Sequence, residues 1–236
     1  MPAFVPPADY PRIKVVHSFE ELVETPFNEE VNALCWTRDL DGDFQEVVEA
    51  IGEGEAITAV DEQLLETLSL SESGQKAVKV LLEDQRLLRA HDLAPILNCI
   101  HGYPRDEEPG PVRTDVFSFH ADSANAEADT WLCTYHGPAS EGLRNDQAIR
   151  RVDIPETRAA LLELFGGPDG EEFRDFLTDH YYDLHYALLP HAQPFPFGVG
   201  NLWRIAVELR KSPVLPCIHR APETVPGQSP RLLLIS

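Results

Sequence analysis

The residues best suited to chemistry in this chain are His120 and Asp122, which stand two apart, together with His219 and Arg231 far downstream. Two histidines and one carboxylate on one side of a metal ion leave its other positions open, as in the non-haem Fe(II) sites that activate O₂. A nearby guanidinium can bind the distal carboxylate of 2-oxoglutarate through two parallel hydrogen bonds, which a lysine cannot copy. These residue types therefore predict an Fe(II) centre that uses 2-oxoglutarate and O₂.

The first pair of ligands needs a strand to position it. Residues 114–120 are rich in β-branched and aromatic side chains of nearly alternating polarity, which predicts a strand that ends at His120. Alternate side chains share one face of a strand, so Asp122, just past the strand end, could reach the same ion as His120.

The other two residues belong to a predicted hairpin. Residues 214–219 and 231–235 each have the composition of a strand, and the prolines and glycine between them predict a turn. An antiparallel return of the chain would then bring Arg231 close to His219.

The same triad has other interpretations. A lone His-x-Asp arises by chance about once in every couple of chains with this many histidines and aspartates. The support for a metal site therefore comes from the order and spacing of all four residues along the chain. One alternative is a non-catalytic zinc-binding or metal-homeostasis protein. Another is a cupin-like O₂ enzyme without 2-oxoglutarate, in which Arg231 would form only an ion pair at a strand end.

The H-x-D…H…R pattern resembles that of the iron and 2-oxoglutarate dependent oxygenases, which adopt a double-stranded β-helix. The resemblance implies that His120, Asp122 and His219 are the catalytic iron ligands and that Arg231 anchors 2-oxoglutarate. It also implies oxidation of a C–H bond in a small-molecule substrate, by hydroxylation, desaturation or cyclisation. Tyr135, with Trp131, is a candidate for the wall of the cofactor cavity if its strand face points inward, with core packing as the alternative.

A second resemblance, to the uncharacterised bacterial family called domain of unknown function 1826, covers the C-terminal half of the chain. It rests on three short stretches: Cys133-Thr134-Tyr135-x-Gly137-Pro138, His219-Arg220-Ala221-Pro222 and Arg231-Leu232-Leu233-Leu234. The chain departs from that family's usual Gly-Thr at Ala139-Ser140 and from its usual Ser-Pro at Ala221-Pro222. This likeness implies a shared fold and leaves the reaction open.

Composition and charge disfavour some classes of binding partner and indicate a cellular compartment. The formal charge of −21 disfavours nucleic acid and anionic membrane surfaces, and no apolar run reaches the length of a membrane span. The start of the chain, residues 1–7, lacks a positive segment followed by a hydrophobic one, so we expect a cytoplasmic protein. The four cysteines stand apart from one another, which favours reduced, buried thiols. The oligomeric state is left open.

The predicted fold is α+β and mainly β. We expect a single domain over residues 1–236, with a double-stranded β-helix (jelly-roll) core and flanking helices. Residues 1–110 should be mostly helical support, including an amphipathic helix that starts after Ser69 and runs to Ala90. Residues 111–236 should form the β-rich metal-site core.

A helical insert, residues 155–189, interrupts the β pattern of that core. Its second helix should run from Glu171 to Leu189, because apolar residues recur along one stripe. His180 lies on this stripe, and we expect it, like His185 and His191, to be a core or interface histidine and not a metal ligand.

Overall fold

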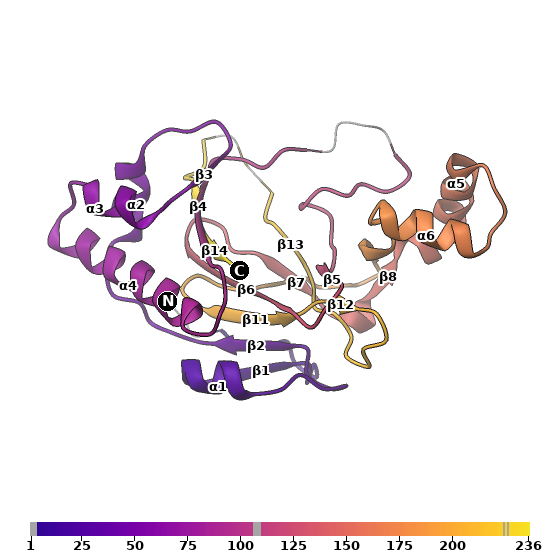
Figure 1. Ribbon diagram of the computed structural model, residues 1–236, viewed down its shortest axis with the longest axis horizontal. Helices are drawn as coiled ribbons and strands as arrows, with labels where there is room; N and C mark the ends of the chain where they lie inside the picture. The colour runs from indigo at the N-terminus through magenta and orange to yellow at the C-terminus, as the bar shows by residue number, and fades with distance from the viewer. Residues whose placement is uncertain (1–3, 106–109, 224, 226) are drawn as a thin grey trace.

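A seven-stranded sheet runs through the structure, a computed structural model that describes residues 4–105, 110–223, 225 and 227–236 (Figure 1). In spatial order its strands are β1 (Ile13–Val16), β2 (Ala33–Trp36), β11 (Leu202–Ala206), β6 (Asp129–His136), β14 (Arg231–Ile235), β4 (Ile96–Ile100) and β3 (Ile57–Ala59). β1 and β2 are parallel, and every other neighbouring pair is antiparallel. The protein is therefore a mixed α/β structure built on a large, mostly antiparallel sheet. Residues 1–3, the first part of the N-terminus discussed above, lie outside the described part of the chain.

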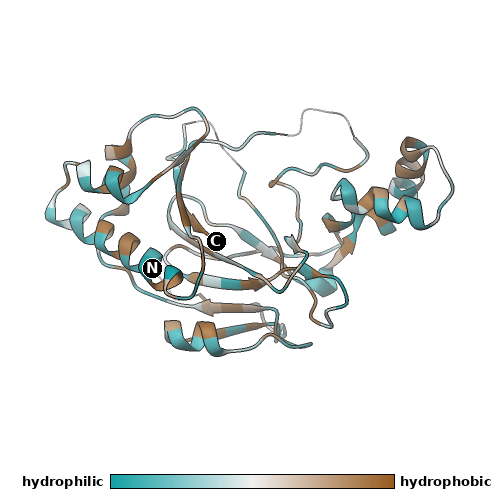
Figure 2. Ribbon diagram, in the orientation of Figure 1, coloured by the Kyte–Doolittle hydropathy of each residue, from teal (hydrophilic) through white to brown (hydrophobic). Residues whose placement is uncertain are grey.

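Four helices cover one face of this sheet: α1 (Phe19–Glu24), α2 (Phe44–Ile51), α3 (Glu62–Thr67) and α4 (Glu72–Arg89). Each begins after a serine or aspartate whose side chain accepts a hydrogen bond from a backbone N–H of the first turn, which stabilises the helix start. In Figure 2, α4 carries hydrophobic and hydrophilic residues along its length, as a helix with one buried face should. Leu81 and Leu88 of α4 pack with Leu232 and Leu234 of β14 in the core on this side.

The amphipathic helix predicted to end near Ala90 is confirmed, but its start differs in detail. The N-cap is Ser71, whose hydroxyl accepts from the Gly74 N–H, and not Ser69. The segment 1–110 contains these four helices, yet it also supplies β1 to β4. It is therefore part of the large sheet as well as its helical cover.

A small sheet lies on the other face of the large one. Its strands follow the order β10 (Phe195–Pro196), β7 (Glu141–Leu143) and β13 (Ile218–Arg220), all antiparallel. His120 extends it by one residue through an isolated antiparallel bridge to His219. Phe195 and Cys217 from the small-sheet side pack with Leu132, Ile205 and Leu233 of the large sheet, so a second core fills the space between the sheets.

The helical insert carries α5 (Pro155–Phe165) and α6 (Glu171–Asp179), which project to one side in Figure 1. The second helix was predicted to reach Leu189, and this is wrong. α6 ends at Asp179, and Tyr181 follows with a positive φ of 59°, which a helix cannot accommodate. Residues 182–184 form a 3-10 turn, and the chain then becomes extended in β9 (Tyr186–Leu188), which pairs with β8 (Ala148–Arg150).

Two predicted strands also differ from the structure. Within residues 114–120 the chain turns at 115–118, with a hydrogen bond from the Ser118 N–H to the Asp115 carbonyl, and only His120 makes a bridge. The strand predicted over 214–219 is shorter and shifted, since β13 begins at Ile218. The strand predicted over 231–235 is confirmed as β14.

The predicted hairpin between the last two strands is wrong. β13 pairs with β7 in the small sheet, whereas β14 lies between β6 and β4 in the large sheet. A short parallel pair, β5 (Ser123–Ala124) and β12 (Glu208–Leu209), follows the His120 segment. Among the described residues, no helix is both long and apolar enough to cross a membrane.

Candidate metal centre

Backbone pairing brings the two histidines of the predicted triad together. The His120 N–H donates to the His219 carbonyl and the His219 N–H donates to the His120 carbonyl, both at 2.9 Å. Residues that exchange hydrogen bonds in this way lie directly opposite each other and share a face of the sheet. Their imidazole centroids are accordingly 4.7 Å apart.

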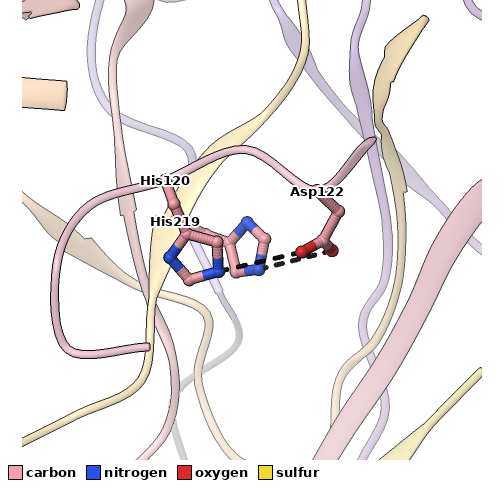
Figure 3. A group of neighbouring side chains, drawn as sticks. All are labelled: His120, Asp122 and His219. Carbon is pink, nitrogen blue, oxygen red and sulfur yellow. Dashed lines mark ion pairs between the residues drawn. The ribbon is translucent and has the colours of Figure 1, made fainter. Parts of the chain in front are cut away.

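Asp122 completes the group from two positions beyond His120. Its Oδ1 lies 3.7 Å from His120 Nε2, and its Oδ2 lies 3.7 Å from His219 Nε2 (Figure 3). The three candidate ligand atoms all lie within 4.8 Å of one another. The hydroxyl of Thr130 donates to Asp122 Oδ2 at 2.6 Å and so fixes the carboxylate. This is the donor set that a 2-His-1-carboxylate metal site requires.

The outer nitrogens of both rings face backbone carbonyls. His120 Nδ1 lies 2.8 Å from the Ser118 oxygen, and His219 Nδ1 lies 3.3 Å from the Cys217 oxygen, in each case two residues earlier. A carbonyl can only accept, so these contacts place the proton on Nδ1 and leave the Nε2 lone pair free. Outer hydrogen bonds of this kind are what hold metal-binding histidines in one tautomer and orientation.

The charge state of the group suits a divalent cation. Burial and the neighbouring His219 lower the pKa of His120 to about 4, so this imidazole is neutral at neutral pH. Burial alone would raise the pKa of Asp122, but His219, the Thr130 hydroxyl and His120 together lower it. The carboxylate is therefore ionised, and the site offers the neutral imidazole of His120 together with one negative charge.

A cavity of about 330 Å³ opens beside the triad. It is lined by Thr114, Asp115, Val116, His120, Ala121, Asp122, Ser123, Tyr181, Leu184 and His185. Two of the three candidate ligands thus face a space of the size that small-molecule sites occupy. A metal held by this triad would therefore lie beside the cavity.

A fourth polar side chain, His185, stands beside the triad, and the sequence did not indicate it. It bridges His120 from the side opposite His219, and the rings of His185 and His120 have centroids 5.7 Å apart. Burial, with smaller contributions from His120 and Arg151, lowers the pKa of His185 to about 4. We expected a core histidine within a helix. The residue is buried, but it lies in extended backbone at the cavity.

Arg231 does not join the triad. It is 4% exposed, and its guanidinium donates to the hydroxyls of Tyr103 at 3.0 Å, Thr134 at 2.9 Å and Ser140 at 2.6 Å. Its Nε has no hydrogen-bond partner among the residues that the structure describes. Burial lowers the pKa of this guanidinium. A cavity of about 30 Å³ adjoins Arg231, and the residues around it are not those around the triad cavity.

Tyr135 lies on the helix-covered face of the large sheet, away from the small sheet that carries His219. Its hydroxyl donates to Asp84 Oδ2 at 2.6 Å, and its ring stacks on Phe44 with centroids 5.5 Å apart. Asp84 in turn pairs with Arg38 at 2.7 Å. The interpretation as a cofactor-cavity wall is therefore replaced by core packing, the alternative for this residue.

Comparison with known proteins gives no relative: no family model matches this chain, and neither the curated proteins nor the solved structures contain a similar one. The two family resemblances therefore stay interpretations of the sequence. The geometry of the site itself is what indicates a function.

Proposed function

We propose that this protein is an Fe(II) and 2-oxoglutarate dependent oxygenase that oxidises a C–H bond of a small molecule. The observation that carries the proposal is the triad, in which two imidazoles and one ionised carboxylate converge beside a cavity. The residues fit Fe(II) because both Nε2 atoms face the Asp122 carboxylate while the outer nitrogens are held by carbonyls. When bound, iron with 2-oxoglutarate and O₂ supplies the oxidising power that protein side chains lack.

The strand order supports a double-stranded β-helix as the underlying fold. Four strands that are neighbours in the large sheet lie opposite the small sheet; in spatial order they are β4, β14, β6 and β11. The spatial order in the small sheet is His120, β13, β7 and β10. Chain connections pass repeatedly between the two sheets: β6 leads to β7, β10 to β11, and β13 to β14. This alternation is what a jelly roll requires, and it accounts for His219 and Arg231 lying in opposite sheets despite their short separation in sequence.

The surroundings of Arg231 support a carboxylate site. A buried guanidinium ordinarily pairs with a carboxylate, whereas the groups that Arg231 contacts are three uncharged hydroxyls. Hydroxyls can also donate to an incoming carboxylate, so the set suits the distal end of 2-oxoglutarate.

A short chain of contacts links Arg231 to the triad. Ser140, whose hydroxyl Arg231 contacts, accepts a backbone hydrogen bond from Phe197 at 2.8 Å, and the Phe197 ring lies 6.3 Å from that of His219. Arg231 would hold the co-substrate, and the cavity beside His120 and Asp122 would admit the substrate.

A second function is favoured by one observation. The cavities beside Arg231 and beside the triad share no residue among those described, so the triad could also serve a metal protein that binds no 2-oxoacid. A cupin-like O₂ enzyme and a zinc-binding protein both belong to this class.

Anaerobic titration separates these functions. The protein is loaded with Fe(II), and its visible spectrum is followed as 2-oxoglutarate is added. A weak charge-transfer band that saturates supports the proposal, since it requires the keto acid to chelate the iron. Succinate is the matched control: it carries both carboxylates but no keto group, and it should give no band. Absence of a band in iron-loaded protein would reject 2-oxoglutarate and favour the second class.

A further inference from the structure

His185, His120 and His219 form a row across the edge of the small sheet. His120 bridges both of the others in antiparallel fashion, so the three side chains leave the same face of the backbone. The ring of His185 is 5.7 Å from that of His120, on the side away from His219. The row continues through Gly142, which pairs with His219 and has no side chain.

His185 differs from the two ligand histidines in how its outer nitrogen is satisfied. The Nδ1 atoms of His120 and His219 each face a carbonyl, but the buried Nδ1 of His185 has no hydrogen-bond partner within the described part of the chain. The residue is only 4% exposed, and an unsatisfied polar atom is costly at that depth. Such a cost at a candidate site points to a role that involves a ligand.

The position of His185 favours a hydrogen bond to that ligand over coordination of the metal. It lines the same cavity as His120 and Asp122, yet it does not belong to the group whose donor atoms lie within 4.8 Å of one another. The His185 side chain therefore borders the cavity through which a ligand would reach the metal.

We propose that His185 is a positioning residue that hydrogen-bonds to the small, hydrogen-bond-accepting molecule entering the open side of the metal, and that it does not ligate the metal itself. This inference rests on the proposed metal function. The backbone at His185 is held independently of the imidazole ring. The Arg151 N–H donates to the His185 carbonyl at 2.8 Å, and the N–H of the next residue, Tyr186, donates to the Phe119 carbonyl, also at 2.8 Å. Changes to the side chain should therefore leave the local fold in place.

The test uses Co(II) as the metal and azide as the probe ligand. Visible absorption of the Co(II) protein reports coordination, and azide titration reports affinity at the open position. His185→Phe keeps a ring of similar shape and removes both nitrogens, whereas His185→Gln keeps hydrogen-bonding capacity. We expect unchanged cobalt content, about tenfold weaker azide binding in His185→Phe, and most of the affinity restored in His185→Gln.

His180→Phe is the matched control, because His180 packs on Phe176 and Tyr182 and does not line the cavity. Unchanged azide affinity in His185→Phe, with cobalt bound, overturns the inference. Loss of cobalt from both His185 variants also overturns it, since His185 would then be a ligand. Failure of the wild-type protein to bind Co(II) is a different result, which rejects the triad and the proposed function with it.

Discussion

The triad and the Arg231 site are both built from polar side chains, buried at Arg231 and partly buried at His120 and Asp122, but these side chains are satisfied in different ways. At the triad, Asp122 is held by a threonine hydroxyl and the two histidines by carbonyls, and the group opens on a cavity of about 330 Å³. At Arg231, the positive charge meets three hydroxyls and no carboxylate among the residues that the structure describes, beside a cavity of about 30 Å³. The proposed function takes the triad as a cation site, whereas Arg231 leaves a charge that an anion could balance.

The difference shows that one sequence motif can distribute its residues over two environments. His120 and His219 meet through direct pairing within one sheet, so their proximity is a matter of register. Arg231 reaches Thr134 on the neighbouring strand β6 of its own sheet, and it reaches Tyr103 and Ser140 in the loops that follow β4 and β6. The first relation depends on one strand pairing, whereas the second also depends on two loops.

The largest effect should come from removing a triad ligand. His120→Ala, Asp122→Ala and His219→Ala should each lose most of the bound metal, because two remaining donors do not hold an ion in a defined geometry. Elemental analysis of protein loaded with Fe(II) and desalted measures the content. His136→Ala is the control: His136 contacts Ser229, away from the triad, and the variant should retain metal. Equal content in the wild type and all three variants would contradict the assignment.

Arg231→Leu should affect co-substrate binding without affecting metal binding at the triad. The variant should keep iron but bind 2-oxoglutarate about 2 to 4 kcal/mol more weakly, the usual penalty for stranding one partner of a buried charge pair. The charge-transfer titration measures the shift in co-substrate concentration. Arg220→Leu is the comparison, since Arg220 already pairs with Glu141 at 2.6 Å and should not affect the co-substrate. Equal affinity in wild type and Arg231→Leu would leave Arg231 a structural residue only.

A smaller effect is expected on the helix-covered face of the large sheet. Tyr135→Phe removes the hydroxyl that donates to Asp84, a hydrogen bond to a charged group, and should lower the free energy of unfolding by about 1.5 kcal/mol. Urea denaturation measures this loss, and metal content and 2-oxoglutarate affinity should not change. Weaker co-substrate binding at unchanged stability would instead indicate that Tyr135 contributes to the cofactor site.

The smallest effect concerns local motion at the triad. Metal binding should slow hydrogen exchange at the amides of His120 and His219, which donate to each other's carbonyls, by tying both strands to one ion. Mass-spectrometric exchange with and without metal measures this. Helix α5, in the insert, should change less, and equal slowing there would mean that the metal acts on the protein as a whole.

Patterns confined to a few residues predicted part of this molecule well. The apolar periodicity before Arg89 predicted α4, and the run of leucines after Arg231 predicted β14. The two-residue spacing of His120 and Asp122 predicted that they would approach each other, and they do. In each case the information lies within the segment itself.

Other features could not be predicted because they depend on distant parts of the chain or on single backbone angles. The apolar stripe of the insert continues past Asp179, but the positive φ of Tyr181 ends the helix, and no residue type there signals it. His185 consequently joins the triad region and not a helix face. The hairpin expected between His219 and Arg231 failed because strands adjacent in sequence belong to different sheets.

Gly142, the next member of the histidine row, offers a route for engineering. A Cβ at this position would meet the rings of Phe195 and Phe197 inside ordinary contact distance, so even an alanine would have to push an aromatic ring aside. The Phe197 ring stacks on the His219 imidazole with centroids 6.3 Å apart, so a displaced Phe197 ring should change the packing around that imidazole. If the triad holds the proposed metal, a substitution at Gly142 would therefore alter the surroundings of that metal without contacting it.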